Sequence, residues 1–254
     1  MAEPRMKTWI ATSDAASITV RGLDLVEEVI GRYGFTEMLY FNLAGRFPAA
    51  GEARILDACL VTLMEHGITP SSLIARLVTD SVPNQMQVAV AAGLTVVGDV
   101  FVGTMEGCAA ILSRGIAAGG DADAFCRGVV AEHRAAGKRL PGFGHPFHKP
   151  DDPRTPRLFA FAREQGVAGH HIALLERLNI ALDAAAGRHQ TINATGAVAA
   201  LLLEIGLPAD MFRGVALVSR CGGLLAHVQE ERREPSARHI WAVVEENMEY
   251  RDPD

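Results

Sequence analysis

The sequence predicts an all-α protein. Alanine, leucine, glutamate and arginine are abundant, and apolar residues recur at spacings of three and four, which is the period of an amphipathic helix. The alternation of valine, isoleucine, threonine and tyrosine that is typical of strands is scarce. With 254 residues, 49% hydrophobic and 21% charged, the chain is long enough for a sizeable core and too apolar for a disordered protein.

Capping residues and apolar stripes place the helices of the first half. Asp24 is a suitable cap for the first helix, and Pro70 opens the fourth, since a proline in the first turn loses no hydrogen bond. The run from Gln87 to Val97 is apolar almost all round, so we expect a helix buried on several sides at the centre of the molecule. The helices are expected, in order, at 24–33, at 35–45, around Ile55 and ending at 66, from 70 onward, and at 87–97.

A glycine-rich break at 115–120 is interpreted as a domain boundary. The prediction is a large helical domain made of residues 1–118 and 210–254, into which a smaller helical domain of residues 119–209 is inserted. Residues 140–156 carry five prolines and two glycines and are expected to form a structured loop instead of a helix. The helices of this second half are expected at 121–136, 156–163, 170–186, 194–205, 209–228 and 236–247.

Charge and cysteine content exclude several classes of protein. Thirty acidic residues stand against 24 lysines and arginines, so the basic excess that drives nucleic-acid binding is missing. No stretch has the length and apolar character of a signal peptide or a membrane span. The cysteines form no CxxC pair, which argues against a zinc site or a disulfide framework and favours a reducing cytoplasm. They are Cys59, Cys108, Cys126 and Cys221.

The loop GFGHPFHK at 142–149, followed by DDPR at 151–154, is the richest cluster of functional groups in the chain. Glycines let a ligand approach the backbone, arginine matches carboxylate or phosphate, and histidine exchanges protons near neutral pH. The cluster therefore indicates chemistry on an anionic substrate. The alternative is an exposed loop that prolines stiffen. NAD binding is disfavoured because no strand precedes the lone GFG and its third glycine is missing.

Two further residues have both a structural and a functional interpretation. His66 ends an apolar helix, where a histidine often only bonds the last carbonyls. Arg220 lies inside an apolar helix and needs an anion, which is either an internal carboxylate or a ligand. The remaining histidines of interest, His148, His170 and His171, are expected to face water.

The order of several motifs is that of a known family. The most specific match is GFGH at 142–145 with DPR at 152–154, in which the arginine follows the histidine by nine positions. The other matching motifs are RGLDL at 21–25, GRFP at 45–48, EHG at 65–67, PSS at 70–72 with Arg76, and SR at 219–220 followed by GGLLAH. Over nearly the whole chain this order resembles the citrate synthase family, including the citryl-CoA-cleaving module of ATP citrate lyase.

The resemblance implies a citrate synthase-like fold of two helical domains with the active site in the cleft between them. Arg154 and Arg220 would hold substrate carboxylates, and His66 and His145 would contact the hydroxyl, carbonyl and carboxylate groups. Coenzyme A, bound only as part of the substrate, would lie over residues Leu140, Pro141, Gly142, Phe143, Gly144 and Lys149. No resident metal or cofactor is implied. The protein is expected to be a homodimer or higher oligomer, in which Arg233 or Arg238 crosses to the partner subunit.

The chain departs from the family pattern at two positions. Phe101 stands where citrate synthases have a histidine that stabilises the thioester enolate. The ATP citrate lyase module also has a phenylalanine there, and this resemblance favours cleavage over synthesis. Thr195 stands where the family has a catalytic aspartate, and a hydroxyl cannot act as a carboxylate base. Phe101 and Thr195 are both predicted to line the catalytic pocket.

The expected reaction is cleavage of a 3-hydroxyacyl-CoA thioester, with citryl-CoA giving acetyl-CoA and oxaloacetate as the model. No ATP-grasp or phosphate loop is seen, so another protein would activate citrate. Two alternatives remain: a non-catalytic protein that binds CoA or a polycarboxylate, and a lyase for a different 3-hydroxyacyl-CoA.

Overall fold

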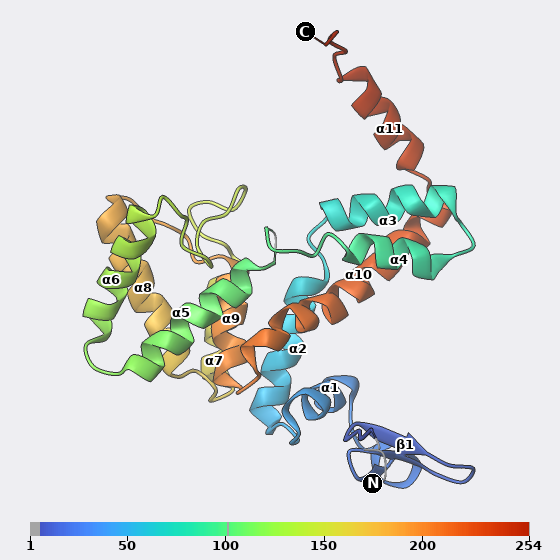
Figure 1. The fold of residues 1–254 in the computed structure, drawn as a ribbon, viewed down its shortest axis with the longest axis horizontal. Coiled ribbons are helices and arrows are strands. Elements are labelled where there is room, and N and C mark those ends of the chain that lie inside the picture. The colour runs from blue at the N-terminus through green and yellow to red at the C-terminus, as the bar shows by residue number, and fades with distance from the viewer. Residues whose placement is uncertain (1–5, 101, 254) are drawn as a thin grey trace, which may run out of the picture.

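The computed structural model describes residues 6–100 and 102–253, and helices dominate these segments (Figure 1). The all-α prediction is therefore confirmed. The α-helices are α1 (Phe35–Ala44), α2 (Ala50–Met64), α3 (Pro70–Ser81), α4 (Met86–Leu94), α5 (Thr104–Ala118), α6 (Ala122–Ala135), α7 (Arg154–Glu164), α8 (His170–Ala186), α9 (Ala194–Glu204), α10 (Phe212–Arg233) and α11 (Ala237–Glu246).

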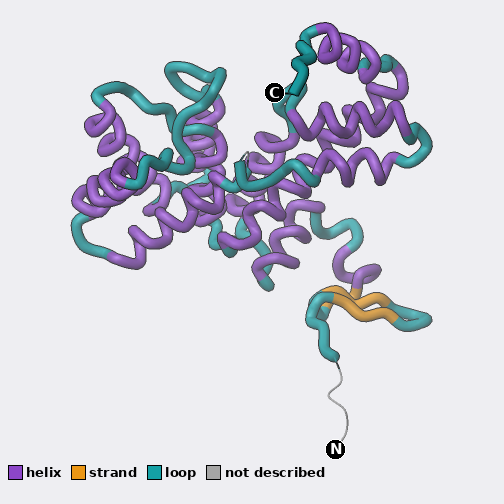
Figure 2. Tube along the Cα trace, turned by 45° about the horizontal axis from the view of Figure 1, so that its top comes forward, coloured by secondary structure: helices purple, strands orange, loops and turns teal. Residues whose placement is uncertain are grey.

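A small antiparallel sheet near the N-terminus was not expected from the sequence (Figure 2). Its strands are β1 (Ala11–Ser13), β2 (Ile18–Val20) and β3 (Leu23–Asp24), paired in that order. Arg21 and Gly22 both have positive φ angles and make the two-residue turn between β2 and β3, a geometry that matches the twist of a hairpin. Strands this short give almost no alternating pattern, which explains the error.

The predicted helix over 24–33 is much shorter in the structure. Asp24 does cap it, since its carboxylate accepts hydrogen bonds from the backbone N–H groups of Val26 and Glu27. The helix then forms only the π-helical turn η1 (Leu25–Val29). Gly31, with a φ of 79°, lies in the left-handed region just beyond it and turns the chain before α1 begins.

Three other helix boundaries move in ways that affect the functional residues. Helix α2 ends at Met64, so His66 lies in the turn that follows it. Helix α7 begins at Arg154, and Pro156 lies in its first turn, where its missing N–H costs nothing. Helix α10 continues to Arg233, beyond the predicted end at residue 228.

The buried side chains form two clusters. The larger surrounds α9, whose residues 197–202 are fully buried, and takes side chains from α2, α5, α8 and the start of α10. The smaller lies between α3, α4 and the second half of α10, where Leu224 and Val228 pack against Ala89 and Val90. Arg220 therefore lies on α10 between the two clusters. The larger cluster continues across residue 118, and the division into domains at that residue stays a prediction.

Helix α4 contradicts the expectation of a central, buried helix. Ala89, Val90 and Gly93 are buried against α3 and α10, whereas Val88 is 40% exposed. Figure 1 shows α4 in the lobe opposite α6, not at the centre. The pattern correctly predicted an apolar helix, but no described residue of the chain covers the face that carries Val88. Among the described helices, none is long and apolar enough to cross a membrane.

Two glycines allow α9 to contact the loop that precedes α7. A Cβ on Gly196 would clash with the carbonyl oxygen of Gly142. Gly142 is itself buried, and its φ of 89° is in the region that favours glycine. We therefore expect Gly196→Ala to lower the free energy of unfolding by about 1 to 3 kcal/mol, as measured by urea denaturation, because the loop must move away. Gly128→Ala in α6 is the matched control, since nothing lies within 4 Å of its Cβ. Equal stability of the two variants would contradict this account of the contact.

Candidate active site

Three histidines from two segments meet on the surface of the fold. His66 comes from the turn after α2, and His145 and His148 come from the loop between α6 and α7. One ring nitrogen from each lies within 4.8 Å of those of the other two. The Nε2 atoms of His66 and His148 are 3.2 Å apart, and the rings of His145 and His148 stack with centroids 4.3 Å apart. His148 is half-buried in this cluster, so the expectation that it faces water is wrong.

Backbone contacts with the segment before α9 hold the histidine loop in place. Gly144 donates its N–H to the carbonyl of Thr191 at 2.8 Å, and Asn193 donates its own to the carbonyl of Gly142 at 3.1 Å. Phe143 forms an isolated β-bridge with Ile192. The loop is therefore structured, as predicted, and its position is tied to the start of α9.

Arg154 is held by a neighbouring carboxylate that the sequence analysis did not identify as its partner. Its Nε and Nη2 atoms donate to the two carboxylate oxygens of Asp152 at 2.9 and 2.7 Å. Asp152 is fully buried and also accepts the backbone N–H of Ala194. Burial by itself would raise the pKa of Asp152, but the hydrogen bonds from Arg154 outweigh burial and hold it at about 2. The guanidinium is thus fixed in orientation, and its side chain remains partly exposed.

Arg220 has a much weaker internal partner. Its Nη1 lies 3.4 Å from Oε1 of Glu65, and that carboxylate also contacts Nε2 of His227 at 3.0 Å through both oxygens. The side chain of Arg220 is only 15% exposed. Burial lowers the pKa of Arg220, against the opposing effect of Glu65. An internal carboxylate is therefore present, but it contacts Arg220 through Nη1 alone and at a long distance, and the binding of a ligand anion stays a prediction.

The electrostatic environment favours neutral histidines at the cluster. The pKa of His66 is lowered, mainly by burial and then by the charge of Arg154, with smaller contributions from His148 and Arg220. The pKa of His145 is also lowered, by burial first and His148 second. The charges of both arginines predicted to bind carboxylates thus oppose protonation of His66.

The hydrogen bonds of His145 fix its tautomer. Its Nδ1 accepts the backbone N–H groups of Phe147 and His148 at 3.1 and 3.0 Å. A neutral ring with its lone pair on Nδ1 carries its proton on Nε2, so His145 presents a hydrogen-bond donor to a ligand. The same bonds disfavour a metal ion bound to this histidine cluster, because the Nδ1 lone pair is occupied and Arg154 and Arg220 repel a cation.

Thr195 lies in the first turn of α9 and joins the same network. Its Oγ1 donates to Oδ1 of Asn193 at 2.7 Å and lies 3.0 Å from the hydroxyl of Thr104. Asn193 in turn donates from Nδ2 to the carbonyl of Gly144, next to His145. Phe101, the other departure from the family, lies outside the described residues.

Neither of the arginines predicted to cross between subunits joins the histidines of its own chain. Arg233 is exposed at the end of α10. Arg238 is exposed on α11 and pairs with Asp80 at 3.3 Å. Figure 1 shows α11 extending outward from the end of α10, and its first turn contacts α3. Their predicted role in a partner subunit's site stays a prediction.

A cavity of about 960 Å³ lies beside the histidine loop. Leu140, Phe143, Gly144 and Lys149 line it, four of the residues predicted to bind CoA. The other two, Pro141 and Gly142, do not line the cavity; Gly142 lies against Gly196 of α9, and Pro141 lies against Gly107 of α5. Basic side chains are concentrated around this cavity. Apart from Lys149, none of them was predicted from the sequence to bind a ligand. The signal that could have identified them is the pair of basic dipeptides, KR at 138–139 before the loop and RH at 188–189 after α8. The basic side chains are Lys138, Arg139, Lys149, Arg188 and His189.

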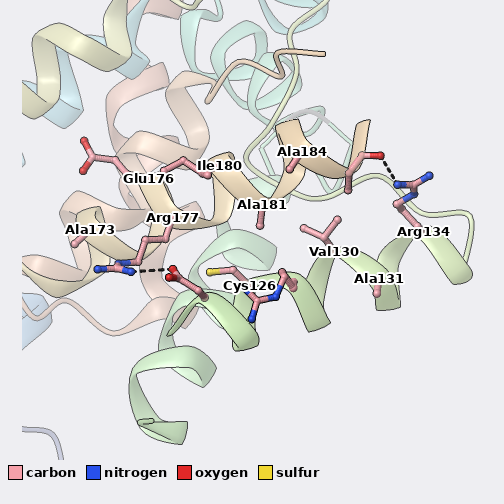
Figure 3. Close-up of a pocket in the computed structure, with 13 residues that line it drawn as sticks. Cys126, Val130, Ala131, Arg134, Ala173, Glu176, Arg177, Ile180, Ala181 and Ala184 are labelled. Atoms are coloured by element: carbon pink, nitrogen blue, oxygen red, sulfur yellow. Dashed lines mark hydrogen bonds and ion pairs between the residues drawn. The ribbon is translucent and has the colours of Figure 1, made fainter. Parts of the chain in front are cut away.

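A separate groove of about 1100 Å³ runs between α6 and α8 (Figure 3). Apolar side chains line it, among them Val130, Ala181 and the largely exposed Ile180, together with the ion pair of Arg177 with Asp123. It contains none of the residues predicted to act on a substrate. The chemistry-bearing residues are thus gathered at the histidine loop, not in this groove.

Comparison with known proteins agrees with the motifs. Residues 5–241 match the family model of citrate synthase, C-terminal domain. The citrate synthase of Haloferax volcanii is 28% identical over 227 residues, covering 86% of this chain and 58% of that protein. A probable ATP-citrate synthase of Caenorhabditis elegans is 25% identical over 237 residues, or 85% of this chain and 21% of that one. The chain spans about half the length of the first curated relatives it matches.

One solved structure matches this chain over nearly its whole length, and a second matches it over part of a longer chain. Citryl-CoA lyase from Hydrogenobacter thermophilus superposes with a TM-score of 0.88 and 30% sequence identity, covering 98% of this chain and 95% of that chain. ATP citrate lyase from Methanothrix soehngenii, in complex with citrate and coenzyme A, gives a TM-score of 0.80 at 18% identity. That match covers all of this chain and 43% of the other.

Proposed function

Because this chain belongs to the citrate synthase family, we propose that it is a lyase that cleaves citryl-CoA to acetyl-CoA and oxaloacetate. The observation that carries the proposal is the cluster of His66 with His145, to which the family motifs add Arg154 and Arg220 as carboxylate-binding residues. The likeness to a citryl-CoA lyase of nearly the same length supports cleavage over synthesis.

Cleavage needs a base and a hydrogen-bond donor at the substrate hydroxyl. The base takes the hydroxyl proton, the carbon–carbon bond breaks, and its electron pair passes into the thioester enolate, which then accepts a proton on carbon. His145 carries its proton on Nε2 and supplies the donor, which stabilises negative charge developing on the oxygen. His66, whose pKa is lowered by desolvation and by the charge of Arg154, supplies the base.

The two arginines fit the two free carboxylates of the citryl group. Arg154 is oriented by Asp152, and Arg220 retains donors that Glu65 does not satisfy. Binding by both would fix the substrate's position relative to His66 and His145, and fixed geometry of this kind lowers the barrier of the reaction.

Coenzyme A is proposed to bind in the cavity beside the histidine loop, as part of the substrate and not as a resident cofactor. Apolar side chains such as Leu140 and Phe143 suit its pantetheine arm, and the basic residues around the cavity suit its phosphates. No resident metal is proposed. We also propose a cytoplasmic location, since the four cysteines are free thiols.

Thr195 is proposed to line the pocket near the reacting carbon. Thr195→Val removes the hydroxyl that contacts Asn193 and Thr104 and is expected to slow cleavage by about 10- to 1,000-fold, the range for one lost donor. Thr195→Ser retains the hydroxyl and serves as the matched control in steady-state assays. A Val variant with the wild-type rate would place Thr195 outside the reaction.

A homodimer is proposed from the uncovered apolar face of α3, α4 and α10, where Leu77, Val88 and Leu225 are 40–42% exposed. Val88→Glu should shift the sedimentation coefficient towards that of a monomer at micromolar concentration, because the interface would have to bury a charge. Ile180→Glu, in the groove between α6 and α8, is the control and should leave the assembly unchanged. A wild-type protein that sediments as a monomer would contradict the proposal.

A panel of thioesters tests which acyl group the site accepts. Purified protein is incubated with citryl-CoA, citramalyl-CoA and malyl-CoA, and the keto acid released from each is followed. The proposal expects the highest kcat/KM with citryl-CoA, because it offers both carboxylates that the arginines can bind. Higher activity with another thioester would favour a lyase for a different 3-hydroxyacyl-CoA.

The second candidate is a non-catalytic protein that binds CoA or a polycarboxylate. It is favoured by one observation, the threonine at position 195 in place of the family's aspartate. Calorimetric binding of CoA, together with no cleavage of any of the three thioesters, would support this candidate over the lyase.

A further inference from the structure

We propose that His148 is a positioning residue for His66, which holds the His66 ring in the tautomer with Nδ1 free and shares the proton that His66 takes from the substrate. This inference rests on the proposed lyase function. It assigns a role to a histidine for which the sequence predicted only solvent contact.

The contact between the two rings is a hydrogen bond in which one nitrogen must carry the proton. Their Nε2 atoms lie 3.2 Å apart, and the rings are nearly perpendicular, at 83°. Two lone pairs or two N–H groups would repel at this distance. Within the described residues, Nδ1 of His66 has no hydrogen-bond partner. With the proton on Nε2 of His66, Nδ1 is the nitrogen left free to act as a base.

His148 is held firmly enough to fix the orientation of His66. Its backbone N–H donates to Nδ1 of His145 at 3.0 Å, and its ring stacks on the His145 ring at an interplanar angle of 30°. The side chain is half-buried. One loop therefore presents two rings with different tasks: His145 donates to the substrate, and His148 accepts from His66.

The other groups near the substrate leave this histidine pair as the proton acceptor. His145 carries its proton on Nε2 and has no free lone pair. Thr195 has no carboxylate. The charged groups that act on His66 are Arg154, Arg220 and Asp152. Beside two guanidinium groups, a positive charge on one imidazole is unfavourable, and sharing it with a second ring lowers that cost.

The proton balance of the step is complete. The substrate hydroxyl gives its proton to Nδ1 of His66, and the Nε2 proton of His66 moves towards Nε2 of His148. As the carbon–carbon bond breaks, its electron pair forms the thioester enolate. Before cleavage, the hydroxyl oxygen and the α-carbon of the thioester are both bonded to the carbon that carries the hydroxyl. One base can therefore take the proton from the oxygen and later give it to the α-carbon. The proton returns from His66 to the enolate carbon, and the net reaction takes up no proton.

Kinetics on the full-length protein test the proposal. His148→Ala is expected to lower kcat for citryl-CoA by about 10- to 100-fold with KM changed less than about twofold, since proton-transfer groups contribute 10²–10⁴ in rate and His66 itself remains. Added imidazole should restore part of the rate, and His148→Gln, which still accepts from His66, should be less impaired. His170→Ala, an exposed histidine at the start of α8, is the control and should match wild type.

Nitrogen-15 NMR of the histidine rings gives a second readout that does not depend on activity. We expect the Nε2–H tautomer for His66 in the wild type and its loss in His148→Ala. Wild-type kcat in the His148 variants, a loss confined to KM, or an unchanged His66 tautomer would overturn the role of His148. A wild-type protein that cleaves none of the thioesters would instead overturn the lyase proposal, and the tautomer of His66 would still decide the role of His148.

Discussion

Replacing Arg220 by alanine is expected to weaken the binding of oxaloacetate by about 30- to 5,000-fold, which corresponds to about 2 to 5 kcal/mol for a broken buried charge pair. The guanidinium is largely buried between the two hydrophobic clusters, and the one ion pair that it makes among the described residues, with Glu65, is long at 3.4 Å. A buried cation with so little compensation is poised to bind an anion. Isothermal titration calorimetry with the free keto acid measures the effect without turnover.

Arg157→Ala is the matched control for that measurement. Arg157 is exposed on α7 and already pairs with Glu164 at 2.8 Å, so its loss should leave the affinity for oxaloacetate unchanged. Unchanged affinity in Arg220→Ala as well would mean that Arg220 serves only the internal pair with Glu65.

Replacing His145 by alanine is expected to lower kcat for thioester cleavage by about 10²- to 10⁴-fold. The variant loses the Nε2–H donor at the oxygen where charge develops, and donors of this kind are worth factors of this size. His145→Asn, which retains an N–H donor, should be less impaired. Rapid-quench assays with citryl-CoA measure both variants, and a His145→Ala enzyme with wild-type kcat would contradict the assignment.

The pH profile of the wild-type enzyme follows from the same two histidines. Burial lowers the pKa values of His66 and His145, so both are neutral at pH 7 and stay neutral to a lower pH than an ordinary histidine near 6.5. Cleavage requires the neutral forms, so kcat/KM should fall only on the acid side of pH 6.5. An acid limb centred above pH 6.5 would contradict the lowered pKa values.

The sequence predicted helices well where the local signals were complete. The helix expected at 170–186 has these bounds in the structure, and the one expected to open at Pro70 begins there. The small N-terminal sheet was missed because its strands have two or three residues, too few for an alternating pattern. The prediction for helix α4 was a central position, because an apolar pattern indicates that a helix is buried. The pattern does not indicate which element, or which chain, buries it.

The sequence offered candidate residues for the site, but it did not predict how their side chains pair. The family resemblance selected His66, His145, Arg154 and Arg220; of these, the structure places His66 and His145 in one cluster, with ring centroids 5.6 Å apart, and the roles of the arginines stay a prediction. The role of His148 depends on a turn of the loop that brings its ring to His66, 82 positions away in the chain. The sequence shows the three-residue spacing between His145 and His148 but not this approach, because a proline-containing loop has no fixed period from which to derive it.

The most direct test of the central claim is the reaction of purified wild-type protein with citryl-CoA, in which acetyl-CoA and oxaloacetate are quantified together. The lyase assignment predicts that both products appear in equal amounts and that their rate of formation falls in His145→Ala. Stable citryl-CoA in the presence of folded protein that binds CoA would contradict it.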